Sequence, residues 1–366
     1  MSFFKNLALL AACIGPVVAQ TWTHCNPTKE DCDPNPALST DYTWSFNKTL
    51  NDKIWNTTNG VLEYTDDGAE FTIASELQSP TLQSIFYIFF GVVEAHVKMA
   101  KGPGIVSSVV LQSDDLDEID WEWVGYNTTQ IQTNYYSKGV TDYKNGGFFY
   151  VENADTEFHN YTTHWTHEKV EWWVDGELLR TLKYDDSVNA TTKESTFPQT
   201  PCNVRIGVWP AGDPKNPKGT VEWAGGPVDY DAGPYTMVVK DLRVQDFSSG
   251  KEYVYGDDSG SWESIEIVQG NSTAAEEISK PPPKSLSEKW NDLPSGAKAG
   301  VYAGAAGAGA ILLALFIFFF IRQRKKGRLE NALDDAKWTT ERTEMNNFQT
   351  SWKQSEWKHG GYKVVQ

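Results

Sequence analysis

Alternating acidic and apolar residues at positions 115–125, DLDEIDWEWVG, constrain the fold more than any other stretch of this chain. If the stretch is a β-strand, Glu118, Asp120 and Glu122 project from one face, because successive strand side chains point to opposite faces. The apolar residues between them face the other way, where a second sheet can bury them. The pattern therefore predicts a two-layer β-protein with one carboxylate-bearing face.

Paired carboxylates on one face are what the cleavage of a sugar linkage requires. A retaining glycosidase uses one as the nucleophile and the other as a general acid and then a base. A third acid between them would keep their protonation states apart. The alternative is the solvated face of an amphipathic strand, but three like charges at this spacing repel one another and acids are depleted in strands.

The spacing of the outer acids leaves a geometric gap. The α-carbons of Glu118 and Glu122 are about 13 Å apart along a strand, whereas retaining chemistry needs carboxyl groups about 5–5.5 Å apart. Long Glu side chains that lean inward on a curved sheet would close this gap.

Both ends of the chain carry targeting features. Residues 1–19 have one Lys, an apolar run and Val-Val-Ala before Gln20, which is typical of a cleaved secretory signal. Residues 300–321 contain no charge and are long enough for a helix to cross a bilayer. Basic residues follow at once, so residues 322–366 are expected to be a cytoplasmic tail with an unknown partner. The chain is therefore predicted to be a single-pass, type I protein of the cell surface.

Sequons and cysteines agree with export. Six Asn-X-Ser/Thr triplets precede the predicted span, and they begin at Asn47, Asn56, Asn127, Asn160, Asn189 and Asn271. Without Cys13 of the signal, three cysteines remain, and Cys25 and Cys32 are close enough in sequence to join in a disulfide. Cys202 would then be free and buried.

The net negative charge of the expected external region limits which polymers it can bind. Residues 20–321 contain 21 Lys/Arg against 43 Asp/Glu. Such a surface repels nucleic acid and anionic polymers but not neutral polysaccharides. No metal-ligand spacing is present, and His164 and His167 are read as a solvated loop feature, so neither a metal nor a cofactor is predicted.

Short β-runs separated by turns occupy residues from about 40 to 250. They predict an all-β, two-sheet β-jelly-roll sandwich of concanavalin-like type, with the domain spanning residues 20–255. Lys169–Lys183 is the clearest hairpin, with Asp175-Gly176 as its turn. Residues 256–299 are expected to form a stalk. The other predicted strands are Ser84–Met99, Gly104–Gln112, Ile131–Tyr136, Gly147–Val151, Val204–Trp209 and Tyr235–Phe247.

Three segments in order resemble glycoside hydrolase family sixteen, and within it the fungal Crh-type chitin–glucan transglycosylases of the cell wall. They are GIVSSVVLQSDDL followed by DEIDWEW, then HWTHEKVEWWVDG, then the stretch from VWPAGDPKNPKGTVEWAGG to VVKDLRV. The resemblance covers residues 20–255. It implies a jelly roll that transfers chitin chains onto β-glucan, with no cofactor.

The same resemblance assigns roles to individual residues. Glu118 matches the nucleophile, Asp120 the assisting acid and Glu122 the general acid/base. The candidates for substrate binding are Trp209, Trp223, Gln132, Asn134, Asp229 and Tyr230. Buried tryptophans without a ligand are the alternative for the two Trp residues.

Two other functions stay open. A β-glucan or chitin hydrolase would share the glycosyl-enzyme intermediate, and a non-catalytic wall-binding receptor would use the tail for signalling. The three acids argue against the receptor, because a lectin has no use for them.

Overall fold

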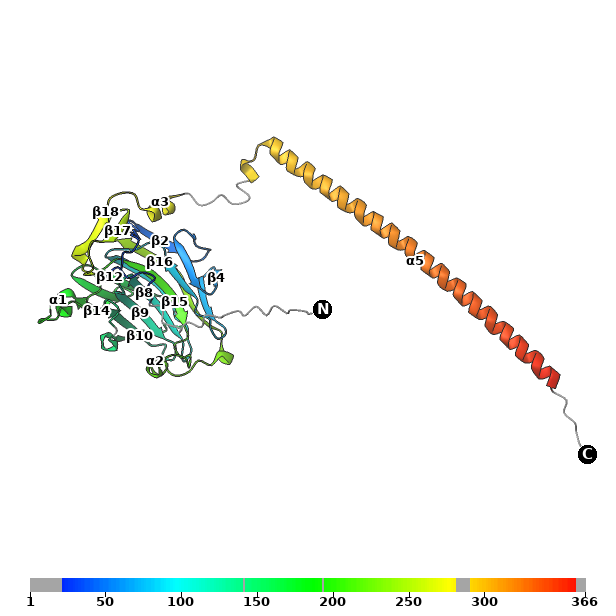
Figure 1. Cartoon of the computed structure of the whole chain (residues 1–366), viewed down its shortest axis with the longest axis horizontal. Coiled ribbons are helices and arrows are strands. Elements are labelled where there is room, and N and C mark those ends of the chain that lie inside the picture. Colours follow the sequence, from blue (N-terminus) through cyan, green and yellow to red (C-terminus); the bar gives the residue numbers. More distant parts are fainter. Residues whose placement is uncertain (1–21, 141, 193, 281–289, 360–366) are drawn as a thin grey trace, which may run out of the picture. The chain divides into compact units, whose positions relative to one another are not determined.

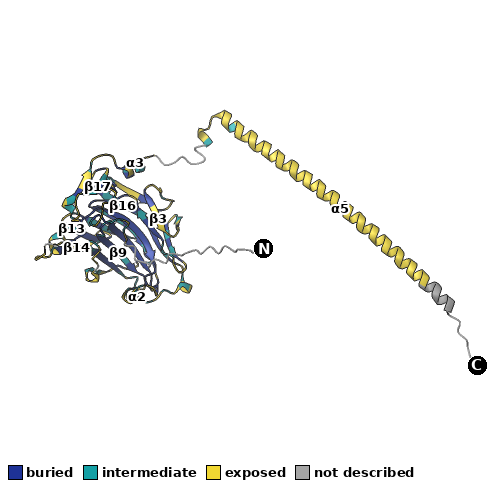
Figure 2. Cartoon of the chain, in the orientation of Figure 1, coloured by how far each residue is buried: buried dark blue, intermediate teal, exposed yellow. Residues whose placement is uncertain are grey.

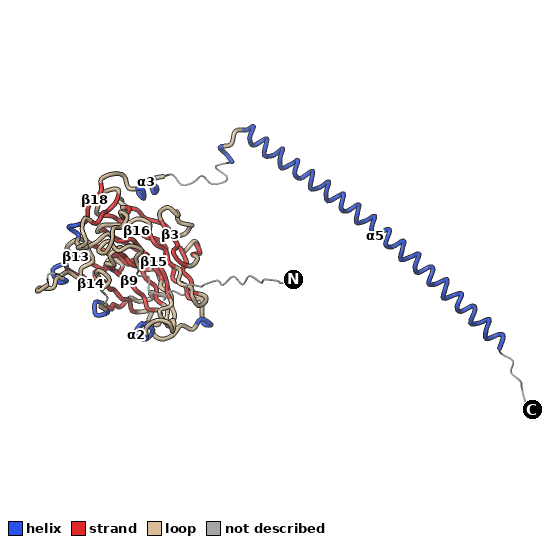
Figure 3. Tube along the Cα trace, in the orientation of Figure 1, coloured by secondary structure: helices blue, strands red, loops and turns tan. Residues whose placement is uncertain are grey.

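The computed structural model describes residues 22–140, 142–192, 194–280 and 290–359, with side chains as far as residue 351 in the last range. The chain divides into two units, Met1–Lys280 and Pro281–Gln366, each described by itself. The predicted signal peptide, residues 1–19, lies outside the described residues. The first unit is rich in strands (Figures 1 and 3).

Two antiparallel sheets form the body of the first unit. We call the sheet that holds residues 118–122 the front sheet, and its strand order is β11-β10-β9-β8-β15-β6-β3. Its strands are β3 (Trp55–Asn59), β6 (Thr81–Ser84), β8 (Val106–Ser113), β9 (Glu118–Val124), β10 (Gln130–Tyr136), β11 (Gly147–Tyr150) and β15 (Cys202–Trp209).

The back sheet has the order β14-β13-β12-β7-β16-β5-β4, and β2 pairs with β16. Its strands are β2 (Asp41–Ser45), β4 (Leu62–Thr65), β5 (Gly68–Ile73), β7 (Gly91–Lys98), β12 (His159–Trp165), β13 (Lys169–Val174), β14 (Glu177–Lys183) and β16 (Tyr235–Asp246). A small third sheet joins β1 (Asn35–Pro36), β17 (Glu252–Tyr255) and β18 (Ile265–Val268). The predicted jelly-roll sandwich is confirmed.

The core lies between the two sheets, where the strands are dark blue in Figure 2. Trp121 and Trp123 of β9 are 1% and 0% exposed and their rings contact Tyr161 of β12. Trp121 Nε1 also donates to Thr163 Oγ1 at 3.0 Å. Each fully buried large apolar side chain contributes about 1.5–3 kcal/mol, so this face of β9 is held firmly against the back sheet.

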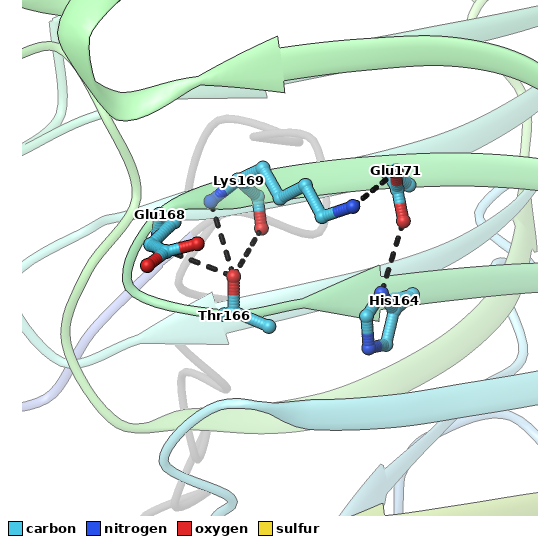
Figure 4. A network of polar contacts seen from close by, with 5 residues as sticks. All are labelled: His164, Thr166, Glu168, Lys169 and Glu171. Carbon is cyan, nitrogen blue, oxygen red and sulfur yellow. Dashed lines mark hydrogen bonds and ion pairs between the residues drawn. The ribbon is translucent and has the colours of Figure 1, made fainter.

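The predicted hairpin of residues 169–183 is confirmed as β13 and β14. Asp175 and Gly176 adopt φ values of 49° and 83°, as a two-residue turn of this kind requires. At the other end of β13, Figure 4 shows His164 Nδ1 and Lys169 Nζ on opposite oxygens of Glu171, at 3.0 and 2.6 Å. Within the described residues no cluster of metal-ligating side chains is found, and His164 belongs to a strand rather than to a loop.

The run Ser84–Met99 was predicted as one strand, and this is wrong. β6 ends at Ser84 and β7 begins at Gly91, with left-handed φ values of 62° at Phe90 and 154° at Gly91. A Cβ at residue 91 would lie 2.1 Å from the carbonyl oxygen of Gln245. The chain must therefore change sheets here through a glycine.

The expected stalk, residues 256–299, also needs correction. Residues 256–280 pack on the globular unit, because β18 pairs with β17 and Ser272 Oγ donates to Ala37 O at 2.5 Å. The short helix α3 (Thr273–Ser279) follows. Residues 295–299 are already helical, and 281–289 lie outside the described residues.

The second unit is dominated by one helix, α5 (Ser295–His359). It contains a window of mean hydropathy 2.4 and, within the described residues, is the one helix long and apolar enough to cross a membrane. The helix also continues beyond residue 321, as far as His359.

The cysteines pair as expected. Cys25 and Cys32 form a disulfide with an S–S distance of 1.96 Å. Cys202 is free and buried.

Candidate active site

The three acids of β9 lie on the outer face of the front sheet, flanked mostly by polar residues of the two neighbouring strands. Glu118 is paired in register with Gln112 of β8 and Tyr136 of β10. Asp120 lies between Val110 and Asn134, and Glu122 lies between Ser108 and Gln132. The period-two pattern therefore places the carboxylates as the sequence predicts.

These carboxylates are less exposed than the sequence suggests. Glu118 and Asp120 are only 6% and 2% exposed, and Glu122 is partly exposed. The back sheet supports them from below, since Trp172 Nε1 donates to the backbone oxygen of Asp120 at 3.1 Å. The acids thus form a crowded, largely dehydrated group rather than a solvated strand face.

Crowding changes their proton affinities. Burial, reinforced by the charge of Glu118, raises the pKa of Glu122 to about 8. Burial, the charges of Glu118 and Glu122, and a hydrogen bond with Glu118 raise the pKa of Asp120 well above its ordinary value. At neutral pH Glu122 therefore holds its proton beside Glu118.

Arg205 of β15 is a buried cation that interacts electrostatically with this group. It pairs in register with Val110, which itself pairs with Asp120. Burial lowers the pKa of Arg205, and the charges that oppose this effect include Glu118. Arg205 is 3% exposed and its Nε donates to Asn203 Oδ1 at 2.9 Å, so its charge is held in place.

A loop with the short helix α2 (Lys218–Trp223) reaches the Glu122 end of β9. Trp223 Nε1 donates to Gln132 Oε1 at 2.8 Å, and Gln132 is the register partner of Glu122. Trp223 is partly exposed, whereas Trp209 is 7% exposed and packs in a small apolar cluster with Val106. Of the two tryptophans expected to stack on sugars, only Trp223 has an open ring beside the carboxylates.

The remaining predicted binding residues divide into two groups. Asn134 is paired with Asp120, and its Nδ2 donates to Tyr136 Oη at 2.6 Å. Asp229 Oδ1 accepts from the backbone N–H of Asp231 at 3.1 Å and so caps a turn. Tyr230 packs against the main core, and burial together with the charges of Asp213 and Glu76 raises its pKa to about 12. The described contacts do not link Asp229 or Tyr230 to the three acids.

Three neighbours of the carboxylates were missed by sequence reasoning. They are Gln112, Tyr136 and Arg205. Extending the period-two count along QIQTNYY would have found Tyr136 after Gln132 and Asn134. Nothing local marks Gln112 or Arg205, because only strand pairing brings β8 and β15 beside β9.

A second pair of acids, Asp115 and Asp117, has a structural place. Asp117 accepts hydrogen bonds from Ser137 Oγ at 2.7 Å and Thr200 Oγ1 at 2.9 Å. Both carboxylates are fully buried, and burial together with Asp117 raises the pKa of Asp115 to about 7. This hydrogen-bond network holds the turn that leads into β9 and so helps to position Glu118, the first residue of that strand.

The sequon asparagines are all at least partly exposed. Asn56 is notable because it pairs with Gln83, which pairs with Arg205. It therefore lies on the same outer face as the carboxylates, at the edge strand β3.

Fold and site together define a β-sandwich glycosidase with three carboxylates on its open face. The sequence matches the family model "Glycosyl hydrolases family 16" over residues 49–225. The chain belongs to this family and is an enzyme of the glycosidase and transglycosylase type.

Within the family the chain is similar to the Crh-like proteins. It is 64% identical over 366 residues to Crh-like protein 3 of Aspergillus fumigatus, covering 100% of both chains. It is 48% identical to a Crh-like protein of Arthroderma benhamiae, covering 96% of both. Among solved structures, apo Crh5 transglycosylase matches with a TM-score of 0.63 and 47% identity, over 66% of this chain and 100% of that one. Crh5 transglycosylase in complex with NAG matches with a TM-score of 0.63 and 48% identity, over 66% of this chain and 99% of that one.

Proposed function

We propose that this protein is a cell-wall transglycosylase that cleaves chitin with retention and transfers the released chain to β-glucan. The observation that carries the proposal is the pKa of about 8 at Glu122 beside the negative charge of Glu118. Retaining chemistry needs one carboxyl group protonated and its neighbour ionised at the same pH. The relatives named as transglycosylases, and the one solved with NAG, support transfer and an N-acetylglucosamine polymer.

In this mechanism Glu118 attacks the anomeric carbon and Glu122 donates its proton to the leaving oxygen. The covalent ester removes the charge of Glu118, which is one of the two causes that raise the pKa of Glu122. The pKa of Glu122 then falls, so the same carboxylate becomes a base that takes a proton from the incoming hydroxyl. That hydroxyl attacks the anomeric carbon, the ester bond breaks, and Glu118 regains its charge.

Asp120 has a supporting role in this proposal. Burial, the charges of Glu118 and Glu122 and a hydrogen bond with Glu118 raise its pKa, and the protonated form donates that hydrogen bond to Glu118 without adding a second charge to the site. Trp223, held by Gln132 beside Glu122, offers a ring face for one sugar unit. Gln132 and Asn134 present amides along the neighbouring strand.

The proposed setting is the outer face of the plasma membrane. The predicted signal, the sequons and the apolar part of α5 support a secreted domain with a single membrane span and a cytoplasmic tail.

The function is tested by incubating the full-length protein in detergent with chitin oligomers and labelled β-glucan oligomers and sizing the products. We expect labelled glucan of increased length. Glu118→Gln and Glu122→Gln are each expected to lower the rate at least about a thousandfold, with the free energy of unfolding within about 1 kcal/mol of wild type. Shortened chitin without transfer would favour the hydrolase, and wild-type rates in both variants would remove the assignment of the acids.

A further inference from the structure

The N-terminal segment Trp22–Asp33 lies against the same face of the front sheet as the carboxylates. The backbone oxygen of Trp22 accepts from Arg205 Nη2 at 3.1 Å and from Gln112 Nε2 at 3.4 Å. The Trp22 ring covers the Arg205 guanidinium, with 5.3 Å from Cζ to the ring centroid. Gln112 is the register partner of Glu118, so this segment contacts an immediate neighbour of the acids.

The segment is built as a fixed wall. The disulfide between Cys25 and Cys32 closes it into a loop, and Asn26 Oδ1 accepts from Thr28 Oγ1 at 2.7 Å inside that loop. Because Gln112 and Arg205 are 0% and 3% exposed, the groups that hold Trp22 are themselves immobile. The wall stands at the Glu118 end of β9, opposite the loop that carries Trp223 at the Glu122 end.

A cavity of about 290 Å³ opens between this wall and the front sheet. The lining residues that matter here are Trp22, His24, Gln83, Tyr87, Asp114 and Arg205. Among the described residues none forms a hydrogen bond with the side chain of Gln83, whereas Tyr87 Oη donates a hydrogen bond to Asp114 Oδ1 at 2.9 Å. Trp22 remains 37% exposed although its backbone is anchored. The cavity thus offers a free amide and an open indole.

These groups suit a neutral, hydroxyl-rich ligand. An aromatic surface with a few fixed polar groups is the usual composition of a small-molecule site. Asp31 and Asp33 also line the cavity, and with Asp114 they outnumber the one guanidinium, which disfavours an anionic ligand. Arg205 is two strands from Asp120, roughly 10 Å at about 4.8 Å per strand, so a short oligosaccharide spans both places.

We propose that Trp22, Gln83 and Arg205 form a distal sugar subsite, in which the N-terminal wall holds one neutral unit of a polysaccharide whose cleavage occurs at Glu118 and Glu122. The subsite rests on the proposed function for its substrate class. With this subsite, an oligosaccharide must be long enough to reach the cavity before it binds at full affinity.

The test separates this subsite from the catalytic centre by measuring binding alone. Full-length Glu122→Gln protein in detergent is titrated with chitin oligomers of increasing length and, separately, with β-glucan oligomers. Affinity is expected to rise by a step at the length that reaches the cavity. Trp22→Ala in the same background should remove that step and weaken the longer oligomers about five- to tenfold. Gln83→Ala should reduce it.

Tyr42→Ala serves as the matched control, because Tyr42 is a similarly exposed aromatic residue, 40% exposed, on β2 of the back sheet. Its length profile should equal that of the parent protein. The polymer whose profile shows the step identifies the chain that occupies the cavity. If Trp22→Ala lowered the affinity equally for oligomers of every length, Trp22 would only support the cleft and the subsite would be overturned. An unchanged dependence of affinity on length in Trp22→Ala would overturn it as well. If no oligomer of either kind binds the parent protein, the proposed function fails as well.

Discussion

At the scale of single residues, the chemistry of this site depends on how closely three acids are crowded. Glu118, Asp120 and Glu122 are spread along one strand, yet the charge of Glu118 raises the pKa of both of the others. In the proposed mechanism, the roles of nucleophile and of acid and base depend on which of these carboxyl groups holds a proton. Residue identity alone does not assign those protons, because burial is the largest cause in both cases.

The raised pKa of Glu122 predicts the pH dependence of the reaction. Its carboxyl group must be protonated to release the leaving group, and with a pKa of about 8 it stays protonated through neutral pH. We expect kcat/KM for transfer to fall tenfold per pH unit above about pH 8, since the proton is lost as pH rises through the pKa. Initial rates measured across neutral and alkaline pH check this. A decline already complete at acidic pH would contradict the protonated form.

At the scale of elements, close backbone contacts place the loop that carries Trp223. A Cβ at Gly212 would lie 2.3 Å from the carbonyl oxygen of Gly226 and 2.6 Å from the Cα of Gly104. Backbone atoms cannot move aside as a flexible side chain can. The position of α2 over the Glu122 end of the sheet therefore depends on glycines in three separate segments.

Gly212→Ala should displace this loop and weaken the bond between Trp223 and Gln132. We expect a loss of about 1–3 kcal/mol in the free energy of unfolding, as for other overpacked sites, and a transfer rate lowered about tenfold or more because a positioning ring has moved. Chemical denaturation and product sizing measure the two effects.

Gly219→Ala is the matched control. Gly219 lies in α2 and a Cβ there would meet nothing within 4 Å, so the change should retain activity and favour the helix by up to about 1 kcal/mol. A Gly212 variant that behaves like this control would show that the loop tolerates the shift.

At the scale of the whole molecule, the chain combines a globular β-unit that ends at Lys280 with a helix of 65 residues. The apolar part of the helix is followed directly by Arg322, Arg324, Lys325, Lys326 and Arg328. Positive charge beside a span favours the cytoplasmic side.

This charge distribution predicts the orientation of the protein. A fluorescent tag after Gln366 should stay with the membrane fraction of intact cells and be digested by protease only after the membrane is opened. An epitope placed in the β-unit should be accessible without opening, which provides the internal control. Release of the full-length protein by an enzyme that cleaves glycolipid anchors would rule out a true span.

Much of the fold could be predicted from the sequence because the side chains of a β-strand alternate between its two faces with a strict period of two. The alternation in residues 118–124 placed Trp121 and Trp123 in the core and the acids on the outer face, and Asp175-Gly176 located a hairpin. The prediction failed at Ser84–Met99, where apolar residues continue through a change of sheet, and at residues 256–280, where short elements pack on the unit without strong periodicity.

The sequence by itself determined the strand that carries the acids, the face from which they project and the apolar segment of the helix, since each of these depends on neighbours a few residues apart. Only the tertiary structure decided which residues surround the acids. Arg205 and Gln112 reach them through strand pairing. Trp223 reaches them through a loop more than a hundred residues downstream in sequence, and Trp22 through the N-terminal wall. Burial and electrostatic fields depend on what is packed nearby, and for these side chains the packing partners are distant in the chain.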